Sequence, residues 1–303
     1  MTILRQLLPL YDNKHHCLPY PRGLQEDDVV NAVILDTETT GLVADVDDIL
    51  QLAILPFQFH RATGRVLLVQ EMLDMYQDPG RPIPPEATAV HHITDEMVAG
   101  KSIDWQLVGQ VLDGAQVIIA HNAGFDRKFV DRRLNVNGIN SRRIWACSYD
   151  MLKWDAPAAK LEILFPWLCG QVYGAHRADA DTNALLHLLH TQGRLPELWD
   201  KARAESYELR CLTDLLKPFM TENNDALKKL GFRFASTPTK HWVRTGIATP
   251  EEAAEMVRYL THEGPPAFQA WASNPRKLFT YSRIPPEERY GIGATLGTIE
   301  ELA

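Results

Sequence analysis

The sequence lacks the features of membrane-spanning, secreted and zinc-clustered proteins. No apolar run approaches the roughly 18 residues that a transmembrane helix needs, and no basic-plus-apolar leader is recognised at the start. The four cysteines, at positions 17, 147, 169 and 211, form no C-x-x-C pair, which argues against a zinc site or a disulfide framework. We therefore expect a soluble, cytoplasmic protein with free thiols and no membrane partner.

The chain also lacks an excess of positive charge. It holds 31 Lys and Arg against 39 Asp and Glu, for a net charge of −8. Residues 201–303 hold 14 basic and 13 acidic side chains, so residues 1–200 hold 17 and 26 and carry −9. This acidic region argues against a broad electrostatic grip on long duplex DNA. The length of 303 residues and the hydrophobic fraction of 45% are those of a globular chain with one large domain or two smaller ones.

Two acids follow the first short apolar run. Residues 32–35, Ala-Val-Ile-Leu, predict a buried strand, and Asp36 and Glu38 come directly after it. Alternate side chains of a strand share a face, so the two carboxylates point the same way, roughly 6–7 Å apart. A cation relieves the repulsion between them, and oxygen ligands suit Mg²⁺ or Mn²⁺. The alternative is a strand end with two solvated acids.

A third acid follows a second apolar run. Residues 117–120 predict another short strand, after which Asn122 is placed as a helix N-cap. Asp126 then falls in the first or second turn of that helix, on a different edge from Phe125. Considered alone, such an acid is also explained by the favourable helix dipole.

A histidine and a fourth acid form the last motif. His176 stands five residues before Asp181, and apolar residues at helical spacing follow at 184–189. This pattern predicts that Asp181 lies near a helix start and that His176 lies on the preceding loop. A loop histidine beside metal-binding carboxylates can accept a proton from water. The alternative is a structural or merely exposed histidine, since the chain has 11 of them.

Together these stretches resemble the DEDDh 3′→5′ exonucleases, the DnaQ-like superfamily that includes the proofreading subunit of bacterial DNA polymerase III. The family motifs D-x-E-T-T-G, H-N-A-x-F-D and H-x-x-x-x-D match residues 36–41, 121–126 and 176–181. Residues 82–100 also resemble the family segment between the first two motifs, with His92 where most relatives have glycine. The resemblance covers about residues 30–195 and implies a ribonuclease H-like fold.

The resemblance implies roles for individual residues. Asp36, Glu38, Asp126 and Asp181 are expected to hold two Mg²⁺ or Mn²⁺ ions, and His176 is expected to be the general base. The residues expected beside the 3′ nucleotide are Thr39, Thr40, Gly41, Leu42, His92, Asn122 and Phe125. Packing in the core is the alternative for Leu42 and Phe125.

The function that follows from the resemblance is a metal-dependent 3′→5′ exonuclease. We expect it to act on single-stranded DNA 3′ ends, in proofreading or DNA repair, and to release nucleoside 5′-monophosphates. The alternatives are an RNA exonuclease of the same family and a non-catalytic nucleic-acid adaptor, although an adaptor has no need of the intact acid set. A polymerase or a sliding clamp is a candidate partner, because residues 6–11 loosely resemble clamp-binding peptides.

The last hundred residues have their own pattern. Residues 226–249 hold five basic side chains and no acid, with aromatic residues between them. The pattern predicts two short strands around the Ser-Thr-Pro-Thr turn at 236–239, then a helix from an N-cap at Thr249 to Gly264. Lys240, Trp242 and Arg244 are candidates for contact with single-stranded nucleic acid. The alternative is a small packing module with an aromatic core.

The order of the elements predicts an α/β fold. Successive strands near 32–36, 49–59 and 65–76 favour an antiparallel meander, while strands near 116–120 and 143–147, separated by helices, favour parallel additions. We expect a ribonuclease H-like mixed sheet flanked by helices, plus a small C-terminal α+β extension. The expected divisions are an N-terminal arm at 1–29, an exonuclease domain at 30–200, a hairpin-plus-helix module at 201–264 and an extended tail at 265–303.

Overall fold

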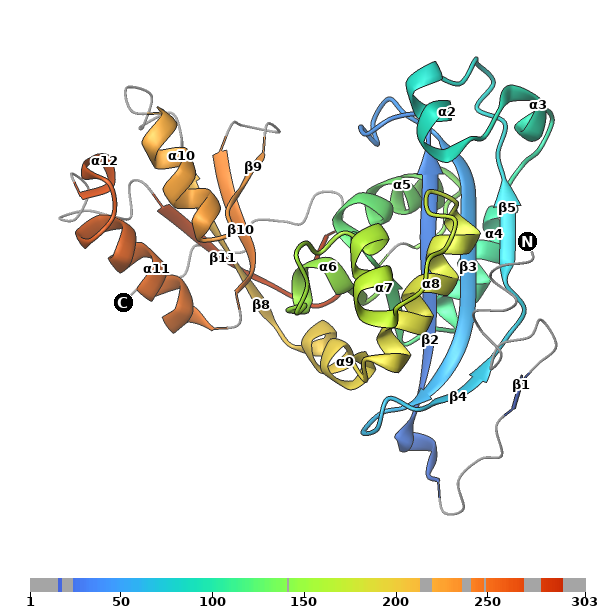
Figure 1. Cartoon of the computed structure of the whole chain (residues 1–303), viewed down its shortest axis with the longest axis horizontal. Helices are drawn as coiled ribbons and strands as arrows, with labels where there is room; N and C mark the ends of the chain where they lie inside the picture. Colours follow the sequence, from blue (N-terminus) through green and yellow to red (C-terminus); the bar gives the residue numbers. More distant parts are fainter. Residues whose placement is uncertain are drawn as a thin grey trace. The chain divides into compact units, whose positions relative to one another are not determined.

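The chain forms two compact units, each with its own sheet and core (Figure 1). The computed structural model describes residues 16–17, 24–140, 142–212, 220–235, 241–247, 249–269 and 279–290. The N-terminal unit comprises residues 1–203 and 290–292, and the C-terminal unit comprises residues 204–289 and 293–303. Within the described ranges, no helix is both long enough and apolar enough to cross a membrane.

A seven-stranded mixed sheet organises the N-terminal unit. Its order is β1-β4-β3-β2-β6-β7, and β5 pairs with β3. The strands β2, β6 and β7 are parallel, whereas β3 pairs antiparallel with β2, β4 and β5. This confirms the predicted mixture of a meander and parallel additions. The strands are β1 (His16–Cys17), β2 (Val29–Thr39), β3 (Ile49–His60), β4 (Val66–Val69), β5 (Leu73–Tyr76), β6 (Val117–Ala120) and β7 (Trp145–Cys147).

Helices cover both faces of this sheet because its central strand is apolar on both. Along β2, Ala32 and Ile34 enter one core cluster, and Val33 and Leu35 enter the other. A strand buried on both faces reads as a continuous apolar run, as residues 32–35 do. The first cluster packs against α6 (Ser148–Met151), α7 (Leu161–Cys169), α8 (Ala178–Thr191) and α9 (Leu195–Arg203), and the second against α4 (Trp105–Asp113) and α5 (Ala123–Val136).

The N-terminal unit also contains two short helices, a 3₁₀ turn and Tyr290, a residue far from the rest of the unit in sequence. A small third cluster joins β3 to α2 (Pro85–His91) and α3 (Asp95–Val98), and a 3₁₀ turn, η1 (Glu26–Asp28), precedes β2. Tyr290 packs against both large clusters, and a Cβ added at Gly124 would lie 3.7 Å from its ring. A residue that follows residues 204–289 of the second unit in sequence therefore packs beside the start of α5.

The C-terminal unit is a four-stranded antiparallel sheet with helices packed on its core. The sheet order is β11-β8-β10-β9. Leu209, Cys211, Trp242 and Phe279 of the sheet share a core with apolar residues of the helices. The elements are β8 (Ser206–Leu212), α10 (Met220–Lys229), β9 (Arg233–Ala235), β10 (His241–Ile247), α11 (Pro250–His262), α12 (Pro266–Gln269) and β11 (Phe279–Ile284).

This unit agrees only in part with the sequence prediction. The pair β9–β10 forms as predicted, although its turn at 236–239 lies outside the described residues, and the Thr249 side chain accepts a hydrogen bond from the backbone of Glu252. The segment from 265 was predicted as an extended tail, but it contains α12 and the paired strand β11. The reason is non-local: β11 is ordered by pairing with β8, about 70 residues earlier, which no local pattern reveals.

Candidate active site

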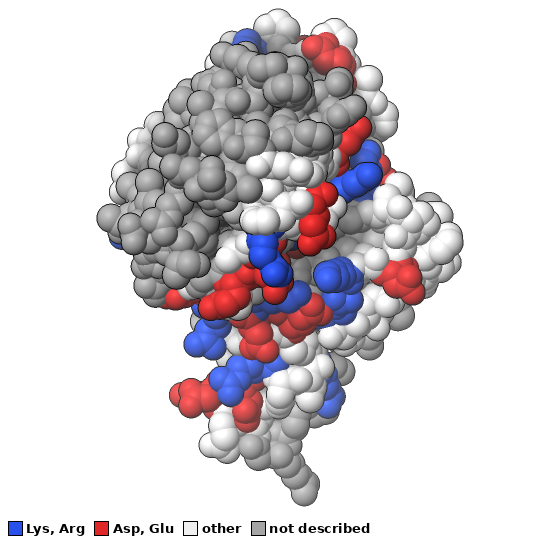
Figure 2. Space-filling view, turned by 90° about the vertical axis from the view of Figure 1, so that its left-hand side faces the viewer, with Lys and Arg blue, Asp and Glu red and all other residues white. Residues whose placement is uncertain are grey.

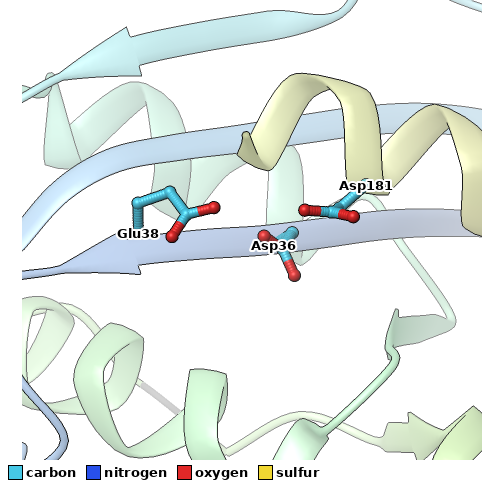
Figure 3. Close-up of side chains that lie close together, drawn as sticks. All are labelled: Asp36, Glu38 and Asp181. Atoms are coloured by element: carbon cyan, nitrogen blue, oxygen red, sulfur yellow. The ribbon is translucent and has the colours of Figure 1, made fainter. Parts of the chain in front are cut away.

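Three acids from two elements converge at the centre of the N-terminal unit (Figure 3). Asp36 and Glu38 lie two residues apart near the end of β2 and share a side of the strand. Asp181 comes from the first turns of α8, which packs across β2 and β3. One carboxylate oxygen from each of the three lies within 4.8 Å of the other two, and all three residues are half-buried.

Asp126 lies beside this cluster. It is buried in the first turn of α5, and its Oδ1 accepts hydrogen bonds from the Thr37 hydroxyl at 2.8 Å and the Thr37 backbone N–H at 3.1 Å. Thr37 lies between Asp36 and Glu38, and the negative charge of Asp126 helps to raise the pKa of both. The structure therefore brings three of the four predicted acids together. The fourth, Asp126, is hydrogen-bonded to the same strand, β2.

The four carboxyl groups are held far from their ordinary ionisation. Burial is the largest cause in each case. Repulsion from neighbouring acids adds to it for Asp36 and Glu38, while a hydrogen bond from Tyr173 partly offsets it for Asp181. The pKa rises to about 8 for Glu38, about 7 for Asp126 and about 6 for Asp181, and well above the usual range for Asp36.

This donor set fits a divalent metal ion. All the grouped ligand atoms are carboxylate oxygens, which hard cations such as Mg²⁺ and Mn²⁺ prefer. When ionised, these acids repel one another, and a bound cation supplies the missing counter-charge. Asp36, Glu38 and Asp181 are the residues that would hold it.

His176 lies on the loop at residues 170–177, between α7 and α8. The residue is exposed, and its backbone N–H donates to Oδ2 of Asp181 at 2.9 Å. Its φ of +64° is a left-handed conformation that costs a non-glycine residue roughly 1–2 kcal/mol. The positive charge of its imidazolium form lowers the pKa of Asp181, so the ring lies within electrostatic reach of the acid cluster.

Two residues that support the site were missed by the sequence analysis. The Tyr173 hydroxyl donates to Oδ1 of Asp181 at 2.6 Å, and burial raises the pKa of Tyr173 well above its ordinary value, which keeps the hydroxyl a donor. No spacing rule singles out this tyrosine. Gln51 had a usable signal, because it is a lone polar residue inside the apolar run of β3.

Hydrogen bonds from the Gln51 side chain connect the start of α8 to the sheet. It is fully buried and pairs in register with Glu38. Its Oε1 accepts hydrogen bonds from Nε of Arg177 at 3.4 Å and from the backbone of Ala178 at 3.3 Å. Its Nε2 donates to carboxylate oxygens of Asp74 at 2.7 Å and Asp179 at 3.2 Å. The strand with Asp36 and Glu38 and the helix with Asp181 thus keep a fixed relative position.

A rigid loop at residues 41–48 follows the first two acids. Leu42 on this loop is 83% exposed. A Cβ at Gly41 would lie 2.5 Å from the Asp47 carboxylate, so any larger residue there would have to displace that side chain. Arginines from outside the loop donate hydrogen bonds to it: Arg81 to the Val46 carbonyl at 2.8 Å, Arg132 to the Asp47 carbonyl at 2.8 Å, and Arg133 to the Asp48 carboxylate at 2.6 Å.

The other predicted substrate contacts occupy varied positions. Thr39 and Thr40 are buried, and their hydroxyls hydrogen-bond to backbone atoms of Gly41 and Asp48. His92 ends α2 in an exposed, left-handed conformation with φ of +60°. Asn122 is the N-cap residue of α5, as predicted. Phe125 packs against the core and against Phe129, with ring centroids 4.9 Å apart.

The predicted contacts in the C-terminal unit need a correction. Trp242 is 6% exposed and belongs to the core, so its ring has no free face for a nucleobase. Its partner on β8, Cys211, lies in the same core, so both side chains are on the helix-facing side of the sheet. Arg244 is half-buried, with its guanidinium over Gly231. Lys240 lies outside the described residues, as does the clamp-like segment at 6–11.

Comparisons with solved structures agree on the fold. A structure of exonuclease I is 15% identical to this chain, with a TM-score of 0.51, and the match covers 82% of this chain and 71% of that one. A second structure of the same enzyme, in complex with a dT13 oligonucleotide, is 14% identical, with a TM-score of 0.51. The mixed sheet flanked by helices is therefore the ribonuclease H-like fold of exonucleases.

Sequence comparisons identify the family. The exonuclease family model, RNase_T, matches residues 33–189. A DNA polymerase III subunit epsilon-like protein of Rhodobacter capsulatus is 32% identical over 192 residues, which are 62% of this chain and 24% of that protein. The epsilon subunit of DNA polymerase III from Treponema pallidum is 29% identical over 166 residues, covering 52% of this chain and 73% of that protein.

The match to several relatives is partial. It covers only 24% of the Rhodobacter protein, 12% of a PolC-type DNA polymerase III of Lacticaseibacillus paracasei and 43% of the epsilon subunit of Pasteurella multocida. The family model, in contrast, contains all four acids and His176 within its matched residues. This chain, with its acid cluster at the end of β2, belongs to the DnaQ-like exonuclease family.

Proposed function

We propose that the acid cluster makes this protein a metal-dependent 3′→5′ exonuclease that acts on single-stranded DNA. The observation that carries the proposal is the convergence of three carboxylates, from β2 and α8, within 4.8 Å of one another. Asp126, on α5, adds a fourth acid that accepts a hydrogen bond from Thr37 of β2. A nucleic-acid adaptor has no use for four acids whose burial opposes their ionisation.

Two divalent ions, Mg²⁺ or Mn²⁺, would supply stabilisation of the charge that develops on the phosphodiester. The chain's own residues do the rest. Asp36, Glu38, Asp126 and Asp181 position that positive charge, and His176 accepts the proton of the water that attacks phosphorus. The bond from phosphorus to the 3′ oxygen of the preceding nucleotide breaks, that oxygen takes up a proton, and a nucleoside 5′-monophosphate leaves.

Two observations support a single-stranded DNA end as the substrate. Leu42 presents an exposed apolar side chain on the rigid loop that follows the acids, where a terminal base could contact it. Among the described residues of the face shown in Figure 2, Lys and Arg side chains are interspersed with Asp and Glu, and this part of the surface does not suit a broad grip on duplex DNA. Relatives named as DNA polymerase III subunits favour DNA over the alternative, an RNA exonuclease, and make a polymerase a candidate partner.

A panel of labelled substrates tests this proposal. DNA and RNA oligonucleotides of one sequence, labelled at the 5′ end, are incubated with Mg²⁺ or Mn²⁺ and sized over time. The proposal predicts a ladder that shortens from the 3′ end of DNA, with slower loss of RNA. Cleavage from the 5′ end, or at internal positions only, would contradict the assignment.

A further inference from the structure

The loop that carries His176 makes two hydrogen bonds to a single carboxylate. The Tyr173 hydroxyl donates to Oδ1 of Asp181 at 2.6 Å, and the His176 backbone N–H donates to Oδ2 at 2.9 Å. Each carboxylate oxygen offers two lone pairs, so each still has one for a cation. The same loop therefore orients both carboxylate oxygens of Asp181 and leaves each with a lone pair for a cation.

The Tyr173 ring is itself held by the core. It meets Phe165 of α7 nearly edge to face, with ring centroids 5.0 Å apart and an interplanar angle of 66°. Phe165 is 1% exposed, and Tyr173 packs against the same core cluster. A buried tyrosine of this kind places its apolar ring in the core and its hydroxyl at a fixed polar partner. The position of the hydroxyl is thus set by α7.

The loop needs such an anchor. His176 has a φ of +64°, and a strained backbone of this kind persists only where surrounding contacts hold it. The hydrogen bonds to Asp181 supply one contact at the strained residue itself and one from Tyr173, three residues earlier in the loop. They connect the conformation of the loop to the orientation of a metal-ligand candidate.

We propose that Tyr173 is a positioning residue that couples cation binding to the placement of His176. Its hydroxyl orients Asp181 for the cation and, through the same carboxylate, holds the His176 loop. The inference rests on the proposed function, because it takes Asp181 as a ligand and His176 as the base. Without the hydroxyl, the Asp181 carboxylate gains rotational freedom and the loop loses one of these two hydrogen bonds. Cation binding and the placement of His176 therefore weaken together.

Tyr173→Phe tests the proposal because it removes only the hydroxyl and keeps the ring against Phe165. Mn²⁺ binding to the full-length chain, measured by electron paramagnetic resonance without substrate, should weaken about tenfold, as is typical when a partner that orients a metal ligand is removed. Hydrogen exchange of a peptide covering 170–177 should accelerate, while peptides from α4 and α5 should not change. At saturating Mn²⁺, kcat should fall, whereas the KM for a short oligonucleotide should stay the same.

Two controls sharpen the test. Tyr259→Phe makes the same chemical change on α11 of the C-terminal unit, where the side chain is 45% exposed, and should change none of these readouts. In an Asp181→Ala background, Tyr173→Phe should cause no further loss of Mn²⁺ affinity, because the hydroxyl acts through that carboxylate.

The outcomes separate this inference from the function on which it rests. If wild type binds Mn²⁺ and Tyr173→Phe binds it equally well, the coupling is overturned, even where the variant melts at a lower temperature. A fall in Mn²⁺ affinity that persists in full in the Asp181→Ala background overturns it too. If the wild-type chain binds no Mn²⁺, the proposed function itself fails.

Discussion

The two units of this protein differ in the local energetics of the residues that the sequence analysis singled out. In the N-terminal unit, four acids are gathered where burial and mutual repulsion raise their pKa values, and His176 keeps a strained backbone beside them. In the C-terminal unit, the residue expected to meet a ligand, Trp242, is buried in an ordinary apolar core. Unfavourable local energetics mark the functional region, and favourable packing marks the supporting one.

The largest expected effect is the loss of hydrolysis when one acid of the cluster is replaced. Replacing Asp36, Glu38, Asp126 or Asp181 individually with Ala should reduce the hydrolysis rate by orders of magnitude, because each supplies negative charge that holds the cations. Folding should survive, since each substitution removes a repelling charge. Rates at saturating Mg²⁺ and circular dichroism check both points. Asp200→Asn, which changes an exposed acid on α9, is the control and should behave as wild type.

The general base gives the next largest effect. His176→Asn tolerates the left-handed backbone and removes the imidazole, so the rate should fall by about 10²–10⁴-fold. The wild-type rate at saturating metal should depend on pH, and the variant should lose the part of that dependence that a general base supplies. A variant with the wild-type rate and pH profile would assign the proton transfer to another group.

Trp242 extends the comparison to the second unit. Trp242→Ala should destabilise this unit by roughly 3–5 kcal/mol, because it empties a large core site. Thermal unfolding measures the loss, and cleavage of a short oligonucleotide below the unfolding temperature should be unchanged. If the variant instead keeps its melting temperature and loses affinity for single strands, the tryptophan is a nucleic-acid contact after all.

The boundary between the units gives a smaller effect. A chain ending after residue 203 should keep metal-dependent cleavage of short oligonucleotides, because the acid set ends at Asp181. It should nevertheless melt at a lower temperature, since it lacks Tyr290, which packs against both core clusters of the N-terminal unit. In the full chain, Tyr290→Ala should reproduce part of that loss, within the roughly 0.5–3 kcal/mol typical of single substitutions. No loss in either protein would show that the contact contributes nothing.

The smallest effect concerns pH and stability without metal. The pKa values of about 6, 7 and 8 for Asp181, Asp126 and Glu38 lie above the ordinary values of 3.8 to 4.5 for these groups. The folded state thus holds these protons more tightly, and the stabilisation is lost as pH rises through that range. The metal-free protein should melt a few degrees lower at pH 8 than at pH 5. Mg²⁺ should restore more stability at pH 8, and Asp36→Asn should flatten the pH dependence.

The sequence predicted whatever depends on local spacing. The apolar runs at 32–35 and 117–120 lie in β2 and β6, and the N-caps at Asn122 and Thr249 follow from residues adjacent in sequence. It missed what depends on distant partners. Gln51 meets Arg177, 126 positions later, and β11 is ordered only by pairing with β8. The sequence left Trp242 open between a nucleic-acid contact and a core residue for the same reason, because the partners of β10 decide which of its faces is buried.

The most direct test of the central claim is the hydrolysis of a 5′-labelled single-stranded DNA oligonucleotide by wild type and by Asp36→Ala, with Mg²⁺ and with excess chelator. The acid cluster predicts a ladder shortening from the 3′ end for wild type with Mg²⁺, and essentially none under the other three conditions. Undiminished hydrolysis in chelator, or by Asp36→Ala with Mg²⁺, would contradict the assignment of this cluster as the catalytic metal site.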